Sequence, residues 1–552
     1  MKKLISLLLI VSTSLTLAKE KKLVNSIQIK NNTFYYTLNV VNVNQQLEFH
    51  VDLKFKSDSI HKVSLPVDYY GTPDLHKWVQ SFKVNNGTKI IEEVSNFRMV
   101  SPNEKGKIHI QYQIKYDPVE LDKYSYAPNV SNTFFYVAGC QWMLPNFPLT
   151  EKATYHISMK SDNKDWTLYS SLSEKVENIV VESSFEDMLW SGFGGNSDQD
   201  SQVRFELEGI KYSVFINGDF SFNKKDFFKE LKQTLLAQES IFNDNEKSYY
   251  HITILPRSGL LAGASIPNLF YCFVDKERPA SQIQDLIGHE YFHKWLPNKM
   301  YLPTLTGEYS FKHEWFHEGF NEYFSRRVLH ETGMMPRDQY VESMNEDVVF
   351  ILNNPSKNET YEQIAARPNF GSAQKKLSYA RGVLIALKWD TELVKKGSSL
   401  KEMLLSLYEI SKKNEFIISY NDLYAFGNKY GLDFKNDFES FILQGKKIPL
   451  TPEAFSGYEI VQKKVQLFYP GFDVSKSSKE KRIHGVDHNG PAHKAGLRNG
   501  MTYVKRKNSN RWSNSWSKEK PYVVTVVDNG QEKAIAFFPY GELAEDYFYQ
   551  KK

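Results

Sequence analysis

The chain has 552 residues, of which 41% are hydrophobic and 24% are charged. This length exceeds what one hydrophobic core supports, and the composition is that of a folded protein, so we expect several folded domains rather than a disordered or fibrous chain. The formal net charge is +4, and Lys and Arg are scattered without a basic block. This pattern argues against nucleic acid as the main partner.

The N-terminus has the features of an export signal. Lys2 and Lys3 precede an apolar run over residues 4–17, and Ala18 with its neighbours offers the small side chains that a signal peptidase requires. The run is too short to span a bilayer. We therefore predict a signal peptide over residues 1–18 and a periplasmic or secreted protein. No later run reaches about twenty apolar residues, so we expect no membrane span in the mature chain.

The two cysteines, Cys140 and Cys272, are far apart in the sequence. In an oxidising compartment they could pair, but two separate buried thiols agree equally well with the pattern. The sequence leaves both alternatives open.

The first part of the chain has the pattern of β-structure. From about residue 20 to residue 208, apolar and polar residues alternate with period two, for example over 34–40, 47–55 and 108–116. Such alternation predicts an antiparallel β domain, most simply a sandwich. No catalytic constellation lies in it, and we interpret it as a scaffold.

The period changes near residue 223. Residues 226–242 have the pattern of an amphipathic helix, and 251–255 and 269–274 that of two strands separated by a stretch rich in Gly and Ala. An apolar stripe of helical period follows from Ile283 to Leu296. Ser281 with Gln284 suggests a capping box at the start of this helix, and Pro297 is expected to end it.

This helix contains His289-Glu290-Tyr291-Phe292-His293. Residues four apart lie on one face of a helix, so both imidazoles can bind one ion. Neutral imidazole is a good zinc ligand, and Glu290 is placed to take a proton from a zinc-bound water. The motif therefore predicts a catalytic zinc site.

A third protein ligand is expected from a second helix that starts near Lys312. It offers Glu314, Glu318 and Glu322. We choose Glu318, because a carboxylate followed by Gly319, which allows close helix approach, resembles the third-ligand segment of gluzincin metallopeptidases. Glu322 lies four residues later and could accept a hydrogen bond from a ligand imidazole. The alternative is that these acids only solvate the helix.

Four segments together resemble the glycyl-aminopeptidase family of gluzincin zinc metallopeptidases, which carry a C-terminal PDZ domain. They are HEYFHKW (289–295), WFHEGFNEYF (315–324), SYARGVLIAL (378–387) and FESFILQG (438–445). The resemblance implies a multidomain α+β fold. Its parts would be a signal peptide (1–18), an N-terminal antiparallel β-sandwich (19–220), a thermolysin-like zinc catalytic domain (221–335), a helical domain (336–455) and a PDZ-like β domain (456–552).

The resemblance also implies roles for particular residues. Tyr379 matches the tyrosine that stabilises the oxyanion, and Arg381 matches the basic position two residues later. The alternative for Tyr379 is a packed aromatic at a helix entry. In thermolysin-like domains the strand just before the zinc helix is the sheet edge that holds an extended substrate, so we expect residues 269–274 to be that edge.

The sequence departs from the related aminopeptidases in two places. Those proteins carry a glutamate ahead of the zinc helix that captures the substrate's free amino group, whereas residues 263–268 here read GASIPN. An ammonium group in a partly desolvated site needs an acid, so either the anchor has moved, to Glu308 or Glu314 for example, or the enzyme is an endopeptidase. The spacing between His293 and Glu318 also differs from that in leukotriene-hydrolase-like aminopeptidases.

The C-terminal segment resembles a PDZ domain. Residues 490–500 fit the Gly-x-Pro-Ala-x-x-Ala-Gly-Leu stretch of bacterial PDZ modules, but without the residue between Gly and Pro, and 469–472 could form a degenerate carboxylate-binding loop. Such domains bind peptide ends by adding a strand to their sheet. A peptide C-terminus is therefore a predicted partner, and a purely structural module is the alternative.

Together these features predict an exported zinc metallopeptidase with one Zn²⁺ per chain, bound by His289, His293 and Glu318. Glu290 would act as the base and Tyr379 as the oxyanion stabiliser, with peptides or unfolded proteins as substrates. Two alternatives stay open. One is an aminopeptidase with a relocated amino-group anchor, and the other is a catalytically vestigial, PDZ-containing peptide-binding envelope protein.

Overall fold

The computed structural model describes residues 33–552 apart from 66–67, 70–71, 95, 123, 125, 145–150, 243, 245–248, 267, 304–313, 367–371 and 508–520. The predicted signal peptide, 1–18, lies outside these residues. The chain divides into two compact units. The first comprises residues up to 239 together with 243–294, and the second comprises 240–242 together with 295–552.

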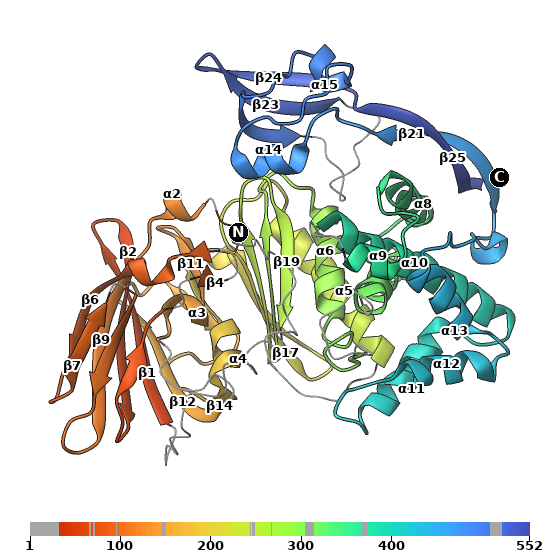
Figure 1. Ribbon diagram of the computed structural model, residues 1–552. Helices are drawn as coiled ribbons and strands as arrows, with labels where there is room; N and C mark the ends of the chain where they lie inside the picture. The colour runs from red at the N-terminus through yellow and green to blue at the C-terminus, as the bar shows by residue number, and fades with distance from the viewer. Residues whose placement is uncertain are drawn as a thin grey trace. The chain divides into compact units, whose positions relative to one another are not determined.

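The first unit begins with two β-sheets that share one core. A six-stranded sheet has the order β14-β12-β1-β2-β9-β6, and a four-stranded sheet has the order β10-β11-β15-β13 (Figure 1). Phe49 of β2 and Phe135 of β11 face each other with ring centroids 5.3 Å apart, within a continuous apolar cluster drawn from both sheets. The predicted sandwich is therefore present. Its pairing is antiparallel, as predicted, except that β1 runs parallel to β12.

The strands of these two sheets are β1 (Thr33–Val43), β2 (Gln46–Lys56), β6 (Val79–Val84), β9 (Lys107–Lys115), β10 (Asn129–Val130), β11 (Phe134–Ala138), β12 (Lys152–Ser161), β13 (Thr167–Ser170), β14 (Ile179–Ser184) and β15 (Gly192–Asn196). Small additional sheets are formed by β3 (His61–Val63), β7 (Lys89–Val94) and β8 (Phe97–Ser101), and by β4 (Asp68–Tyr69) and β5 (Thr72–Pro73). Short helices connect the strands: α2 (Pro118–Leu121), α3 (Gly139–Trp142) and α4 (Phe185–Trp190).

A mixed five-stranded sheet follows in the first unit, with the order β16-β17-β18-β20-β19. Its strands are β16 (Gln202–Leu207), β17 (Ile210–Ile216), β18 (Tyr249–Pro256), β19 (Leu261–Ile266) and β20 (Leu269–Val274). Helices α5 (Lys224–Phe242) and α6 (Ala280–Phe292) cover one face of this sheet (Figure 1).

The predicted sheet edge at residues 269–274 is wrong. This strand is β20, which pairs with β18 on one side and with β19 on the other. All six of its residues are buried, as expected for an interior strand that is covered on both faces. The sheet edge next to β20 is β19, in the stretch rich in Gly and Ala, whose small side chains carry too weak an alternating pattern to be recognised as a strand.

Helix α6 begins and ends differently from the prediction. Pro279 is its N-cap and no side chain caps it, so the predicted capping box is wrong; the Gln284 amide instead donates to the carbonyl of Phe227 at 3.2 Å. The helix ends at Phe292 rather than at Pro297. His293 follows as the C-cap with φ −59° and ψ −17°, which are still helical values. The one-turn spacing of the two histidines is therefore kept.

The second unit begins with a largely helical region, in agreement with the sequence pattern. Its helices are the π-helix η5 (Trp315–Phe320), α7 (Asn321–Glu331), α8 (Arg337–Asn353), α9 (Tyr361–Ala365), α10 (Ser372–Lys395), α11 (Leu400–Ser411), α12 (Tyr420–Lys429), α13 (Phe434–Asp437) and the π-helix η6 (Phe438–Leu443). Among the described helices of the whole chain, none combines the length and the apolar character needed to cross a bilayer.

The second unit ends in a β module with its own small core. Strands β21 (Tyr458–Phe468) and β25 (Tyr540–Lys551) pair as a ribbon, and β22 (Thr502–Lys507), β23 (Tyr522–Asp528) and β24 (Gln531–Phe537) form a second sheet. The β23–β24 hairpin turns at Asn529 and Gly530, with φ of 49° and 79°, as a type I′ turn requires. After residues 469–472 the chain forms helix α14 (Val474–Glu480) rather than a strand. The PDZ assignment stays a prediction.

Candidate metal centre

Two histidines project from the last turn of α6. The ring centroids of His289 and His293 are 4.8 Å apart, and the ring planes are nearly perpendicular, at 84°. His289 is buried and His293 is half-buried. The helical spacing predicted from the sequence therefore places both imidazoles at one location.

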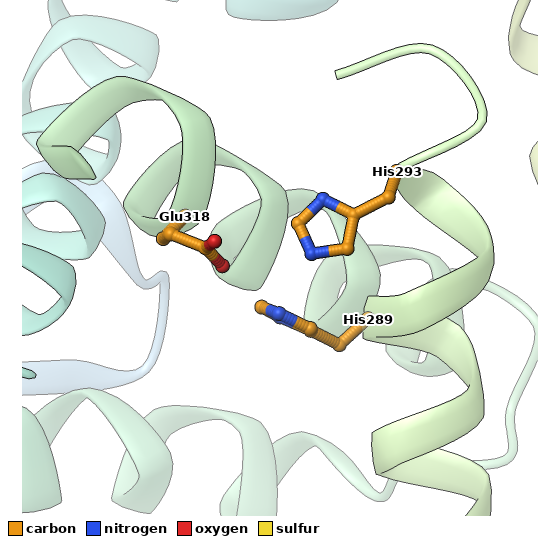
Figure 2. A group of neighbouring side chains, drawn as sticks. All are labelled: His289, His293 and Glu318. Atoms are coloured by element: carbon orange, nitrogen blue, oxygen red, sulfur yellow. The ribbon is translucent and has the colours of Figure 1, made fainter. Parts of the chain in front are cut away.

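Glu318 of η5 completes a group of three side chains that could hold a metal ion. Donor atoms of His289, His293 and Glu318 all lie within 4.8 Å of one another, and Figure 2 shows the carboxylate pointing toward the two imidazoles. Two imidazoles and one carboxylate are the ligand set of many catalytic zinc sites, which leave a further position for water. The donor set therefore fits zinc. Among the described residues, neither Glu314 nor Glu322 belongs to this group.

The π-helix that carries Glu318 crosses α10 at two glycines. A Cβ atom on Gly319 would lie 2.5 Å from the Cα atom of Gly382, and one on Gly382 would lie 2.0 Å from the carbonyl oxygen of Trp315. Any larger residue at either position would separate the two backbones. The close helix approach predicted for Gly319 is thus confirmed. Its partner, Gly382, was not predicted from the sequence, although this glycine lies in one of the family-like segments.

Glu290 is buried against the edge strand β19. A Cβ atom on Gly263 would lie 2.7 Å from both the Cγ and the Oε1 atoms of Glu290, so the glutamate occupies the space that a side chain on the strand would need. The hydroxyl of Tyr126 donates to the carbonyl of Gly263 at 3.3 Å. The stretch that lacks an amino-group anchor thus has a different role here, because it makes room for the predicted base.

The groups around Glu290 are buried and protonated. Burial raises the pKa of Tyr126, Tyr250 and Cys272, and the charge of Glu290 raises each of them further. All three therefore keep their protons at neutral pH, and none competes with Glu290 as an anion or a base. Cys140 and Cys272 are both buried free thiols, which agrees with the unpaired alternative.

Tyr379 lies on α10, the helix that contacts η5. Its carbonyl oxygen would be 2.9 Å from a Cβ atom on Gly319, so the backbones that carry Tyr379 and Glu318 touch. Its half-buried ring packs against an apolar cluster that includes Phe350 and Leu377. Both the catalytic role and the packing role are compatible with this placement, and the role in stabilising an oxyanion stays a prediction.

Arg381 ties two of the family-like segments together. Its Nη2 donates to the carbonyl of Lys357 at 2.8 Å and to that of Gly445 at 3.5 Å, and its side chain is 5% exposed. Burial lowers its pKa to about 10, so the guanidinium stays charged at neutral pH. The basic position of the 378–387 segment thus holds the backbone of the 438–445 segment.

The other glutamates of the second helix have separate environments. Glu322 is buried and accepts from Arg326 at Nε (3.1 Å) and Nη2 (2.9 Å), while Arg326 also donates to Asp347 at 2.6 Å. A hydrogen bond from Glu322 to a ligand imidazole stays a prediction. Glu314 is buried, and Glu308 lies outside the described residues.

Two further residues that contact α6 were not predicted from the sequence. Gln238 and Glu239, at the end of α5, make buried hydrogen bonds to the turn that carries the histidines. The sequence feature that could have indicated them is that two adjacent polar residues, Gln238 and Glu239, lie within the amphipathic helix predicted over 226–242.

Three comparisons relate the chain to known proteins. Residues 282–384 match the family model described as M61 glycyl aminopeptidase, and this segment contains all five predicted site residues. The predicted resemblance to glycyl aminopeptidases is thus confirmed over this segment. The C-terminal module lies outside the match.

Two curated proteins are similar to the chain over about a quarter of their own length. Leucine aminopeptidase 2 of Yarrowia lipolytica is 25% identical over 182 residues, which cover 30% of this chain and 27% of that protein. Leucine aminopeptidase 2 of Lodderomyces elongisporus is 22% identical over 181 residues, covering 33% and 25%. The matched segment thus spans about a quarter of these relatives.

The fold as a whole is similar to a solved structure. An aminopeptidase N family protein from Idiomarina loihiensis aligns with a TM-score of 0.66 at 14% identity, covering 94% of this chain and 98% of that one. The multidomain α+β architecture, with its sheets and helical region, is therefore shared over nearly the whole chain.

Proposed function

We propose that the chain is a zinc-dependent metallopeptidase that binds one Zn²⁺ through His289, His293 and Glu318. The observation that carries the proposal is the convergence of these three donors within 4.8 Å. The same three residues lie inside the segment that matches a peptidase family.

The remaining site residues supply the proton transfers and the substrate contacts. Zinc held by such ligands polarises a carbonyl and lowers the pKa of a water ligand to about 7. Glu290 accepts a proton from the attacking water and delivers it to the leaving amine. The Tyr379 hydroxyl donates a hydrogen bond to the oxygen on which negative charge develops. An extended substrate pairs with β19, the sheet edge against which Glu290 packs.

Elemental analysis and a mixed peptide library assay test this function together. The purified wild-type chain should hold one zinc and cleave peptides, as detected by mass spectrometry. Glu290→Gln should keep the zinc, because Glu290 is not a ligand, and should lose most of the turnover. Glu318→Ala should lose zinc on mild dialysis. Absence of zinc and of cleavage in the wild type would favour the vestigial peptide-binding alternative instead.

The cleavage mode has two candidates, each favoured by one observation. The stretch 263–268 holds no acid to bind an amino terminus, which favours an endopeptidase acting on extended chains. The matched relatives are named leucine aminopeptidases, which favours an aminopeptidase with an anchor elsewhere, such as Glu314. Paired peptides decide this question, one with a free and one with an acetylated amino terminus. Loss of cleavage on acetylation would exclude the endopeptidase.

We also propose that the protein is exported, because residues 1–18 have the features of a signal peptide, and that the C-terminal module binds peptide ends. The two PDZ-like segments touch there, since a Cβ atom on Gly471 would lie 2.9 Å from the Cδ atom of Pro491. A cavity of about 610 Å³ lies beside them, lined in part by Tyr469, Lys494 and Tyr540. Helix α14 occupies the place after the loop, so a bound peptide would contact this cavity rather than extend a strand there. Titration of Glu290→Gln protein with labelled peptides, carboxylate against amide at the C-terminus, tests this binding.

A further inference from the structure

The end of α5 contacts the metal-binding turn of α6 through two consecutive side chains. Gln238 donates from Nε2 to the carbonyl oxygen of Gly288, the residue before His289, at 2.8 Å. Glu239 accepts from the Lys294 ammonium at 2.6 Å and from the Tyr291 hydroxyl. These contacts therefore bracket the two histidines in the sequence.

The contacts are made in the interior of the first unit. Gln238 and Tyr291 are fully buried, and Glu239 and Lys294 are 2% and 8% exposed. The hydroxyl oxygen of Tyr212, on β17, lies 3.3 Å from the Glu239 carboxylate and beside the Tyr291 hydroxyl; because Tyr291 donates to Glu239, the single Tyr212 proton goes either to Tyr291 or to Glu239. The sheet, α5 and α6 are thus joined by one buried polar network.

The network holds the face of α6 that points away from the metal ligands. With 3.6 residues per turn, successive side chains are separated by about 100°, so Tyr291 lies about 180° from the midpoint between His289 and His293. The Tyr291 ring also packs edge-on against Tyr250, with centroids 5.0 Å apart. The side of α6 that carries Tyr291 is therefore held by directional hydrogen bonds. The two histidines project from the opposite side, where the ion would bind.

We propose that Gln238 and Glu239 are positioning residues, which fix the rotation and the axial register of α6 so that both imidazoles converge on one ion. Gln238 sets the register through the Gly288 carbonyl, and Glu239 sets the rotation through Tyr291 and Lys294. This inference rests on the proposed zinc site and assigns a role to residues that do not touch the metal.

The required precision explains why such an anchor is needed. A side-chain atom about 5–6 Å from the helix axis moves by about 1 Å when the helix rotates by about 10°. Zinc–ligand distances tolerate only roughly 0.2 Å. Apolar packing alone is non-directional, whereas hydrogen bonds at Gly288, Tyr291 and Lys294 oppose both rotation and sliding.

The buried ion pair of Glu239 with Lys294 allows the positioning role to be separated from a purely stabilising one. Replacing both members of such a pair by apolar residues of similar size is often neutral or stabilising, because no charge is left buried without a partner. A positioning role predicts instead that the metal site is damaged while the fold is kept.

The first test is Glu239→Leu combined with Lys294→Met in the full chain. The unfolding midpoint of the zinc-free protein should fall only slightly, because one buried tyrosine hydroxyl loses its acceptor, while the Kd for zinc, measured by competition with a chelating dye, should rise about 10- to 100-fold, as for other residues that orient metal ligands. Lys224→Met is the matched control, because it breaks an ion pair with Asp198 (3.0 Å) at the other end of α5. It should leave the Kd unchanged.

Tyr291→Phe is a second, milder variant that keeps the folding question separate. It removes one hydroxyl and keeps the ring that packs on Tyr250, so it should fold even where the double variant does not. It should weaken zinc binding several-fold and increase hydrogen exchange over residues 288–294 in the zinc-free protein. Wild-type zinc affinity in both variants, or in Tyr291→Phe where the double variant fails to fold, would overturn the positioning role. Failure of the wild-type chain to bind zinc would instead reject the proposed function, and the positioning role with it.

Discussion

Glu290 and Gly263 are packed so closely that a methyl group on the strand would overlap the glutamate side chain, at 2.7 Å from its Cγ and Oε1 atoms. The side chain of Glu290, the proposed base, occupies the space that is left because Gly263 has no side chain. Backbone at this position is otherwise ordinary, because Gly263 is paired within β19 and its φ is not positive. The requirement for glycine is therefore a requirement for space.

Gly263→Ala should consequently displace Glu290 and lower kcat by about 10²-fold, the size expected for a misplacement of about 1 Å at a reacting group. Zinc content should not change, since no ligand is moved. Steady-state kinetics on a peptide substrate measure the effect. In the Glu290→Gln background the same substitution should cost little more, because it acts through Glu290. A full additional loss there would contradict this explanation.

Tyr379→Phe tests the role proposed for Tyr379. If its hydroxyl donates to the developing oxyanion, kcat should fall by about two to three orders of magnitude with a modest change in KM. If the ring only packs against the cluster around Phe350, removing the hydroxyl should leave kcat unaltered. Single-turnover rates at saturating substrate distinguish the two results.

The candidate ligands could be predicted from the sequence because their chemistry is local. His289 and His293 are related by one helical turn, which no tertiary context is needed to establish, and the structure brings them together. The choice of Glu318 among three glutamates needed the resemblance to a known family. The roles of Gly263, Gln238 and Glu239 could not be predicted, because each depends on a contact with a residue at least 27 positions away (263 to 290).

At the scale of elements, the site depends on helices and strands meeting in particular ways. The π-helical turn η5 places Glu318 directly beside Gly319, at the closest point of the crossing with α10. Such turns are uncommon and are often found at functional sites. The sequence indicated a helix at this place but not its π-helical hydrogen bonding, because the apolar pattern of one turn does not distinguish the two.

Gly382→Ala should push η5 away from α10, since the new methyl group would lie 2.0 Å from the Trp315 carbonyl oxygen. A backbone oxygen cannot move aside as a flexible side chain can, so we expect the zinc Kd to rise and the unfolding midpoint to fall together. Dye competition and thermal unfolding measure the two quantities. An unchanged Kd would show that the helix crossing does not set the position of Glu318.

The edge of the five-stranded sheet shows a limit of sequence patterns at this scale. Residues 269–274 were expected to be the edge because they precede the metal helix, yet their six consecutive apolar residues are the pattern of a strand buried on both faces. The true edge, β19, contains glycine and alanines whose small size serves Glu290. Because Glu290 needs small residues beside it on β19, this strand lacks the alternating pattern of large apolar residues by which a strand is recognised.

At the scale of the whole molecule, the β-sandwich, the helical region and the C-terminal β module follow the order that the periodicities predicted. Each change in period reflects which faces of an element are buried. Burial is the property that the hydrophobic pattern of a sequence indicates best. The predicted domain boundaries stay predictions, because they depend on contacts between distant segments. The stability of the whole molecule also has a pH-dependent contribution that no sequence pattern indicated. It comes from a histidine in the core of the first unit.

His251 is fully buried on β18, and neither of its ring nitrogens has a hydrogen-bond partner among the described residues. Its ring stacks on that of Tyr169, with centroids 4.7 Å apart. Burial, with a smaller contribution from the charge of Arg204, lowers its pKa from 6.5 to about 3. The unfolded chain therefore binds a proton below pH 6.5 that the folded chain does not bind until about pH 3. Stability is consequently lost as the pH falls through this window.

His251→Phe should remove this loss, because phenylalanine keeps the stacking and cannot be protonated. Each pH unit below 6.5 costs about 1.4 kcal/mol, so the wild type should lose about 2 kcal/mol more than the variant between about pH 7.5 and about pH 5. Urea unfolding of both proteins at the two pH values measures the difference.

The variant also lacks the two buried ring nitrogens that have no partners, which changes its stability equally at every pH. Only the pH-dependent part of the difference therefore tests the titration. Equal losses in the two proteins would show that His251 is protonated in the folded chain or is reached by water, and that the acid sensitivity of the molecule arises from other groups.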